Sequence, residues 1–163
     1  MKAVVFSDSH GKVQYMRRAL CRHRNADVCF FLGDGLRDLE QIALEFPTVA
    51  FLSVAGNCDW YAQGVAKEDV FVMEGRRVLY FHGHTVGVKG GIGAAIAAAR
   101  RLDADVLLYG HTHIPYEGCV TEGEKPLYIL NPGSIGEFYE GCAHYGVLEV
   151  RENGILLSHG TVG

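Results

Sequence analysis

The chain lacks the features that mark several large classes of protein. None of its apolar runs is long enough to span a membrane. No basic cluster stands out in a chain whose formal charge is -4, and such a cluster is the usual footprint of binding to a nucleic-acid backbone. Low-complexity segments and internal repeats are also absent. The sequence therefore gives no membrane signal and no strong nucleic-acid signal.

Cysteine occurs without the spacing of a disulfide framework or a thiolate metal site. The five cysteines are an odd number, and none of them form a Cys-x-x-Cys pair. This usage is typical of reduced, mostly buried thiols. The first apolar run begins within a few residues of Met1, which leaves no room for a signal peptide. We therefore expect a cytoplasmic protein.

Apolar sequence is sufficient for a substantial core. Hydrophobic residues make up 48% of the chain, and its length suggests one domain spanning residues 1–163. Spacing of apolar residues predicts an alternation of strands and helices: strands at 3–6, 27–32 and 49–54, and helices at 12–23 and 36–46. Strands joined in this way are expected to be parallel, with right-handed crossovers.

The second half of the chain is richer in strands. Two adjacent strands are expected at 69–73 and 77–81, followed by a helix at 90–102 and a strand at 105–109. Only strands and turns follow, around 119–120 and at 127–130, 147–150 and 155–158, with a hairpin turn at Asn153-Gly154. The whole pattern predicts an α/β (α+β) fold with two sheets and helices outside.

Polar residues follow five of the predicted strands. These residues are Asp8 and His10, Asp34, Asn57, His82, and His111 and His113. Ligands of open α/β sheets collect beyond the carboxyl ends of the strands. Asp8 and His10 should point to the same side, because they lie two apart on what we expect to be extended chain. The sequence therefore predicts one cluster of metal donors.

The number of donors indicates more than one ion. Two carboxylates, four imidazoles and one amide are too many for one tetrahedral ion, but they suit two ions that share a carboxylate. Oxygen and nitrogen donors without thiolate favour Mn²⁺, Fe²⁺, Ni²⁺, Co²⁺ or Zn²⁺ over Mg²⁺ or Ca²⁺. Two ions about 3.5–4 Å apart can clamp the attacking and departing oxygens of an in-line phosphoryl displacement.

The motifs resemble those of the calcineurin-like metallophosphoesterase superfamily. They are Asp8-x-His10, Gly33-Asp34, Gly56-Asn57-x-Asp59, His82-Gly83-His84 and Gly110-His111-x-His113. Within that superfamily, the compact size, the Gly-Asn-Cys-Asp and Gly-His-Thr-His-Ile-Pro segments and Asn131-Pro132-Gly133-Ser134 are similar to those of the small YfcE-like phosphodiesterases. The resemblance extends, in order, over nearly the whole chain.

The resemblance implies a fold, a reaction and a set of roles. The fold would be a four-layer αββα sandwich of two mixed β-sheets flanked by helices. The reaction would be hydrolysis of a phosphodiester by in-line attack of a hydroxide that bridges two divalent ions, with Mn²⁺ favoured. Asp8, His10 and His113 would hold the first ion, Asn57, His82 and His111 the second, and Asp34 would bridge them.

One position departs from the wider superfamily, in which a histidine that assists the leaving group often follows the asparagine. Here that position is Cys58, and a neutral thiol is a poor proton donor. We interpret Cys58 as a small buried residue, Asp59 as a group that orients a ligand or loop, and His84 as either the alternative general acid or a residue that only supports the metal ligands. Lys89 is a candidate contact for a substrate phosphate, although its glycine-rich loop lacks the P-loop ending.

Other functions remain open at this point. The fold also resembles the retromer vacuolar-sorting subunit, a protein-interaction scaffold that does not keep the full metal set, whereas all seven positions here hold competent donors. A phosphomonoesterase and a metal-stabilised structural protein are further alternatives. Trp60, Tyr61 and Tyr139 are candidates for the rim of the cleft. The substrate would be a small phosphodiester or phosphomonoester, and a homo-oligomer is compatible with the sequence.

Overall fold

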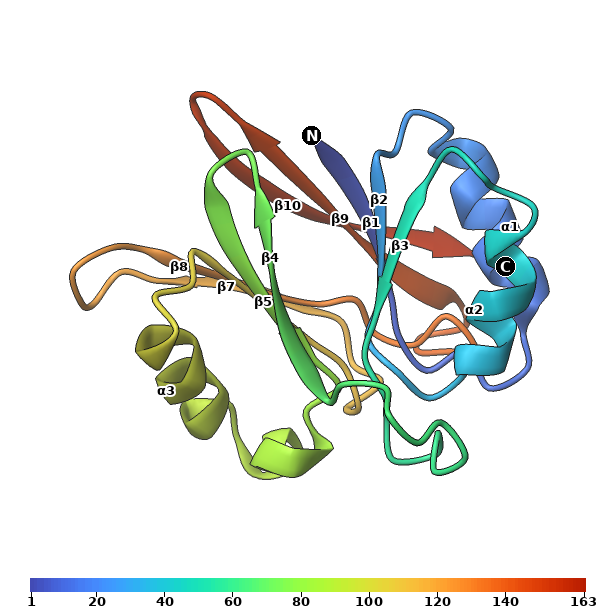
Figure 1. Cartoon of the computed structure of the whole chain (residues 1–163), viewed down its shortest axis with the longest axis horizontal. Coiled ribbons are helices and arrows are strands. Elements are labelled where there is room, and N and C mark those ends of the chain that lie inside the picture. The colour runs from blue at the N-terminus through green and yellow to red at the C-terminus, as the bar shows by residue number, and fades with distance from the viewer.

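The computed structural model describes residues 1–163 as two five-stranded sheets and three α-helices (Figure 1). The first sheet has the strand order β10 (Gly154–Val162), β9 (Ala143–Arg151), β1 (Lys2–Phe6), β2 (Val28–Phe31) and β3 (Ala50–Ser53). The second has the order β4 (Glu68–Met73), β5 (Arg76–Phe81), β6 (Val106–Tyr109), β8 (Leu127–Asn131) and β7 (Tyr116–Val120). The helices are α1 (Val13–Arg22), α2 (Leu36–Ala43) and α3 (Gly93–Arg101). None of these helices is long and apolar enough to cross a membrane.

Both sheets mix parallel and antiparallel pairs. In the first sheet β1, β2 and β3 are parallel, as predicted, while β9 runs antiparallel to β1 and to β10. In the second sheet β5, β6 and β8 are parallel, and the edge strands β4 and β7 are antiparallel to their neighbours. The parallel strands of each sheet therefore end at a common edge, which is where the polar motifs lie.

Three apolar clusters separate four layers. Val4 and Phe6 of β1 pack with the helices α1 and α2, whereas Ala3 and Val5 point to the opposite face, toward the second sheet. This alternation is what a strand buried on both faces requires. A third cluster joins the outer face of the second sheet to α3. Figure 1 shows α1 and α2 on one side and α3 on the other. The predicted αββα sandwich is confirmed.

Some element boundaries differ from the prediction. Helix α2 ends at Ala43, because Glu45 and Phe46 continue as turns whose N–H groups donate to carbonyls three residues earlier. Helix α3 starts at Gly93 rather than Gly90, and two 3₁₀ turns, His84–Val86 and Val88–Gly90, precede it. Strands β9 and β10 extend well beyond the predicted 147–150 and 155–158, since the two pair along their full length.

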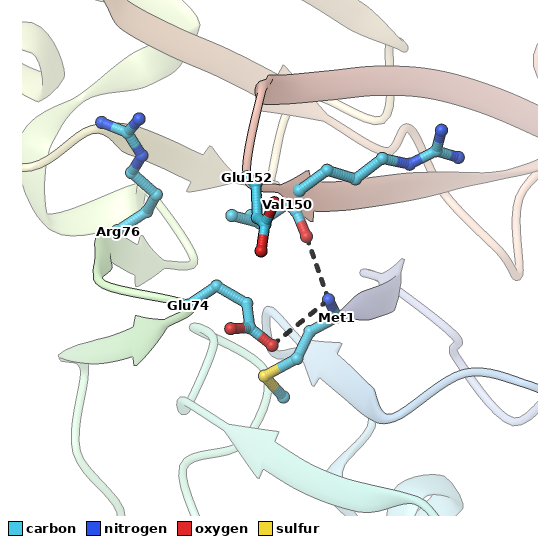
Figure 2. Close-up of a pocket in the computed structure, with 6 residues that line it drawn as sticks. Met1, Glu74, Arg76, Val150 and Glu152 are labelled. Atoms are coloured by element: carbon cyan, nitrogen blue, oxygen red, sulfur yellow. Dashed lines mark hydrogen bonds and ion pairs between the residues drawn. The ribbon is translucent and has the colours of Figure 1, made fainter.

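The end of the sandwich remote from the motifs is closed by charged groups (Figure 2). The Met1 ammonium donates to the Val150 carbonyl at 2.9 Å and lies 3.6 Å from a carboxylate oxygen of Glu74. Met1 and Val150 belong to the first sheet and Glu74 to the β4–β5 turn of the second. A cavity of about 360 Å³ lies here between the sheets, far along the strands from the predicted donors.

Candidate metal centre

The structure brings the seven predicted donors together at the carboxyl edge of the sheets. The first sheet contributes three loops, which carry Asp8 and His10 after β1, Asp34 after β2 and Asn57 after β3. The second sheet contributes His82 after β5, and His111 and His113 after β6. The donors therefore meet between the two sheets, and neither sheet alone supplies a complete set.

Five donors have left-handed backbone conformations, with positive φ angles. The values are 56° for Asp8, 44° for His10, 61° for Asp34, 68° for His111 and 60° for His113. The expectation that Asp8 and His10 lie on extended chain is therefore wrong, because β1 ends at Phe6 and the chain turns sharply at both donors. Strained backbone of this kind is concentrated at functional sites.

The first donor group consists of Asp8, His10 and His113, whose ligand atoms all lie within 4.8 Å of one another. His113 Nε2 is 3.0 Å from Asp8 Oδ1, and His10 Nε2 is 3.8 Å from the same oxygen. The Asp8 side chain is completely buried, and its other oxygen accepts hydrogen bonds from the Ser7 hydroxyl and, at 3.2 Å, from the His111 N–H. Its orientation is therefore fixed before any ligand arrives.

The second donor group consists of Asp34, His82 and His111, with Asn57 beside it. His82 Nε2 is 3.1 Å from Asn57 Oδ1, 3.0 Å from His111 Nδ1 and 3.4 Å from Asp34 Oδ2. The same nitrogen is 3.9 Å from Asp8 Oδ1 of the first group. The two groups are thus neighbours.

The hydrogen bonding of His82 shows why this arrangement suits a cation. His82 Nδ1 lies 2.8 Å from the buried Leu32 carbonyl, to which only an N–H can donate. In a neutral ring, the proton at Nδ1 leaves Nε2 with a lone pair. That lone pair faces the oxygens of Asn57 and Asp34, which are also acceptors. A divalent ion satisfies such converging lone pairs, so the donors fit a metal.

Asp34 is held in its ionised form. Burial opposes ionisation, but the neighbouring His82 ring and the hydrogen bond from the Cys58 N–H outweigh it and keep the pKa of Asp34 well below its usual range. Gly56 lies directly against this carboxylate, and a Cβ at Gly56 would overlap Asp34 Oδ1. The glycine of the Gly-Asn motif is therefore required for close approach of the two loops.

Glu137 is a site residue that the sequence analysis missed. Its Oε2 accepts a hydrogen bond from His113 Nδ1 at 2.7 Å, so His113 Nε2 is left to face Asp8. Ligating histidines commonly donate their second N–H to a carboxylate in this way. Ser134 positions the segment, since its hydroxyl donates to the Asp8 carbonyl and accepts from the Glu137 N–H. The only available signal was that Glu137 closely follows the Asn-Pro-Gly-Ser motif.

Asp59 ties two donor loops together. Its carboxylate accepts hydrogen bonds from four backbone N–H groups, those of Asp34 (2.7 Å), Gly35 (3.0 Å), Leu36 (3.1 Å) and Gly56 (2.9 Å). Asp59 is buried and lies on the loop after β3, whereas three of its donors lie on the loop after β2. These hydrogen bonds hold the backbone at Asp34 next to the loop that carries Asn57.

Cys58 is exposed, in contrast to the buried position that we expected. Its thiol accepts a hydrogen bond from the Asn57 amide at 3.4 Å. Local desolvation together with the nearby Asp34 carboxylate raises the pKa of Cys58 to about 11. Such a weak acid is poorly suited to protonating a leaving group. The backbone N–H of Cys58 also donates to Asp34 Oδ1, at 2.7 Å.

His84 and Lys89 lie on the 3₁₀ turns that follow β5. The His84 ring is 5.3 Å from the His82 ring and 6.2 Å from the His111 ring, between centroids. Burial and the neighbouring His82 lower the pKa of His84. Lys89 is exposed, and its charge contributes, after burial, to a lowered pKa of His111. Both residues therefore border the second donor group without joining it.

The three aromatic rim candidates have different surroundings. Trp60 is 81% exposed and lines a cavity of about 400 Å³ together with Asn57 and His84. Tyr61 is partly buried against Trp60 and beneath the Arg37 guanidinium. Tyr139 instead packs against His144 and pairs with Cys142 in a separate turn. Of the three, Trp60 is the one that lines a cavity shared with the donor residues.

The chain belongs to the calcineurin-like phosphoesterase superfamily, whose domain profile matches residues 1–153. It is 32% identical over 137 residues to the probable metallophosphoesterase YsnB of Bacillus subtilis, covering 83% of this chain and 75% of YsnB. It is 29% identical to the phosphodiesterase YfcE of Escherichia coli, covering 91% and 88%. The predicted family, its YfcE-like character and the class of phosphoric ester hydrolases are confirmed.

Solved structures support the same fold. A conserved protein of Streptococcus pneumoniae, described as a predicted phosphoesterase, superposes with a TM-score of 0.81 at 25% identity, covering 98% of this chain and 88% of that one. Wild-type Vps29 of Entamoeba histolytica, crystallised with Zn²⁺, superposes with a TM-score of 0.71 at 22% identity, covering 99% of each chain. The likeness to Vps29 extends to the fold alone.

Proposed function

We propose that the chain is a phosphodiesterase that works with two divalent ions, Mn²⁺ being favoured, bound between the carboxyl ends of its two sheets. The observation that carries this proposal is the convergence of donor atoms on His82 Nε2, where the acceptor oxygens of Asn57 and Asp34 and a ring nitrogen of His111 all lie within 3.4 Å. The adjacent group of Asp8, His10 and His113 supplies donors for a second ion.

Each donor has a proposed role. Asp8, His10 and His113 would hold one ion, and Asn57, His82 and His111 the other. Asp34 would contact both ions. Its side chain lies beside His82, and its backbone carbonyl accepts a hydrogen bond from the His10 N–H at 3.4 Å. When bound, the two ions would activate water and withdraw charge from the phosphoryl oxygens during in-line attack on phosphorus.

His84 is the proposed contact for the substrate phosphoryl group. Its lowered pKa keeps the ring neutral at pH 7, and a neutral ring still has one N–H to donate. His84 Nδ1 is buried without a hydrogen-bond partner in the protein, so no contact within the protein commits the ring. A neutral imidazole suits hydrogen bonding to an oxygen better than strong general-acid catalysis.

The test is metal-dependent hydrolysis of bis(4-nitrophenyl) phosphate. Protein stripped with EDTA should be inactive and should recover on addition of Mn²⁺. Asp34→Asn should lower turnover at saturating Mn²⁺ by at least about 100-fold, because a neutral amide cannot replace a shared carboxylate. Asp103→Asn is the matched control, since Asp103 also has a left-handed backbone (φ 51°) but is exposed and remote from the donors.

Several outcomes would contradict the proposal. Full activity of Asp34→Asn at saturating Mn²⁺ would show that Asp34 does not bridge the two ions. Tight Mn²⁺ binding without hydrolysis of any ester would favour the scaffold alternative suggested by the likeness to Vps29. Faster hydrolysis of 4-nitrophenyl phosphate than of the diester would favour a phosphomonoesterase. Isothermal titration with Mn²⁺ should give about two ions per chain, and a ratio of one would rule out the dinuclear site.

A further inference from the structure

A cavity beside the second donor group is formed mostly by the loop between β3 and β4. Its volume is about 400 Å³, and its lining includes Asn57, Trp60, Gln63, Lys67 and His84. Asn57 accompanies the second donor group, and His84 lies beside His82. The cavity therefore opens directly onto the place where phosphorus would be attacked, and the organic part of a substrate would extend into it.

Trp60, the aromatic residue of the cavity lining, packs against the neighbouring Tyr61. The Trp60 ring meets the Tyr61 ring edge-on, with centroids 5.9 Å apart. Tyr61 is fixed in turn, because its hydroxyl donates to Asp59 at 3.2 Å and its ring lies 4.2 Å below the Arg37 guanidinium carbon. Trp60 itself remains 81% exposed. An indole supported in this way presents a flat surface to a ligand at little cost in side-chain entropy.

The charged side of the cavity carries one uncompensated cation. This cation is Lys67, which is exposed and has no carboxylate within ion-pair distance. Lys125, elsewhere in the chain, pairs by contrast with Asp103 and Asp105. Asp59 is the only acidic residue of the lining, and four backbone N–H groups already occupy its carboxylate. The cavity thus offers a positive charge next to an aromatic face.

We propose that this cavity binds the substituent that stays on phosphorus when the leaving group departs. This retained group carries an aromatic ring and a second negative charge. The ring would stack on Trp60 and the anion would pair with Lys67. The inference rests on the proposed phosphodiesterase function, and it names the class of substrate. Both an aryl carboxylate and a nucleotide would present this chemistry.

The experiment uses three diesters that release the same leaving group, 4-nitrophenolate. The retained group is methyl, phenyl or 4-carboxyphenyl. For the Mn²⁺-loaded wild-type protein, kcat/KM should rise about three- to tenfold from methyl to phenyl, as expected for an aromatic contact. It should rise by a further threefold or so with the carboxylate, which is the scale of an exposed ion pair. Both gains should lie in KM.

Variants separate the two contacts. Trp60→Ala should abolish the gain from methyl to phenyl, and Trp60→Phe should retain most of it. Lys67→Met should abolish only the gain from the carboxylate. Arg101→Met, which removes an exposed cation at the far end of α3, should leave all three values unchanged. Replacing the carboxyphenyl group with a thymidin-5′-yl group that carries a 3′-phosphate then distinguishes a nucleotide from an aryl carboxylate.

The results can overturn the inference independently of the proposed function. A flat series in the wild-type protein, or variants that slow all three esters equally, would show that the cavity does not select the retained group. Hydrolysis of the methyl ester would still support a phosphodiesterase in that case. If none of the esters is hydrolysed with Mn²⁺ bound, the proposed function fails and the inference fails with it.

Discussion

At the scale of single residues, five of the seven donors occupy backbone conformations that their side chains disfavour. A left-handed conformation costs an L-residue about 1–2 kcal/mol relative to the right-handed one. Contacts between loops compensate for part of this cost: the Asp8 N–H donates to the Gly33 carbonyl at 2.9 Å. The site is therefore built at the expense of local stability, which is a common relationship between function and strain.

This strain can be measured at His10, whose side chain is partly exposed. In EDTA, His10→Gly should be about 1 kcal/mol more stable than His10→Ala, because both lose the ring but alanine retains the strain at φ 44°. The difference should appear as a melting temperature roughly 2–4 °C higher for the glycine variant. Both variants should bind Mn²⁺ weakly.

Higher stability of the glycine variant than of the alanine variant at position 10 would identify backbone strain as the cause. At an ordinary helical position, the order is reversed, since glycine is about 0.5–1 kcal/mol less favourable than alanine. Ala97→Gly, on the exposed side of α3, provides this control. If the glycine variant at position 10 is also the less stable one, the left-handed backbone at His10 carries no measurable strain.

The gathering of these residues at one edge of the sheets could be predicted from sequence, but their backbone conformations could not. Asp34 and His82 follow apolar strands directly and are flanked by glycine, so local sequence placed them at one edge of a sheet. The left-handed angles depend on contacts between loops that are distant in sequence. Glu137 was missed for the same reason, because its relation to His113 arises from the approach of two loops 24 residues apart.

At the scale of elements, Asp59 is the connection between the loops after β2 and β3. Asp59→Asn should destabilise the metal-free protein by about 2–4 kcal/mol, because one acceptor oxygen becomes an amide NH₂ facing buried N–H groups. Turnover should fall as well, since Asp34 and Asn57 would lose their relative position. Urea unfolding in EDTA, with Asp103→Asn as control, measures the first effect. A midpoint equal to that of the control would mean that the two loops hold their positions without Asp59.

Elements were predicted best where both faces of a strand are apolar. The parallel core strands β1, β2 and β6 are short, buried runs, and their positions were correct to within about a residue or two. The long strands β9 and β10 were predicted too short, because residues such as His144, Gly146 and Gly160 interrupt the apolar alternation. Pairing of the two strands, rather than the propensity of either, extends them.

At the scale of the whole molecule, the donors of each proposed ion come from both sheets. Asp8 and Asp34 follow strands of the first sheet, whereas His82, His111 and His113 follow strands of the second. Ions bound there would stabilise the folded protein through their preference for it over the unfolded chain. With free Mn²⁺ at 100 times its dissociation constant, one site contributes about 2.7 kcal/mol.

Metal removal should therefore lower the melting temperature. We expect a decrease of roughly 5–10 °C for each ion lost when EDTA replaces Mn²⁺ at this concentration, given about 2–4 °C per kcal/mol for a chain of this size. The loss should be reversed by Mn²⁺ in a concentration-dependent way, and it should be much smaller for Asp34→Asn. A melting temperature that does not respond to Mn²⁺ in the wild-type protein would contradict binding between the sheets.

The Met1–Glu74 pair lies at the end of the sandwich opposite the donors, so metal binding should stabilise the two ends unequally. There the sheets are joined across their ends by the exposed contact of the Met1 ammonium with Glu74, a kind of pair that contributes little in water. Ions bound at the carboxyl edge would hold the two sheets together at that end. At the opposite end the sheets could still separate. Hydrogen exchange should therefore slow on metal binding at the ends of β1 and β6, while the β4–β5 turn continues to open as before.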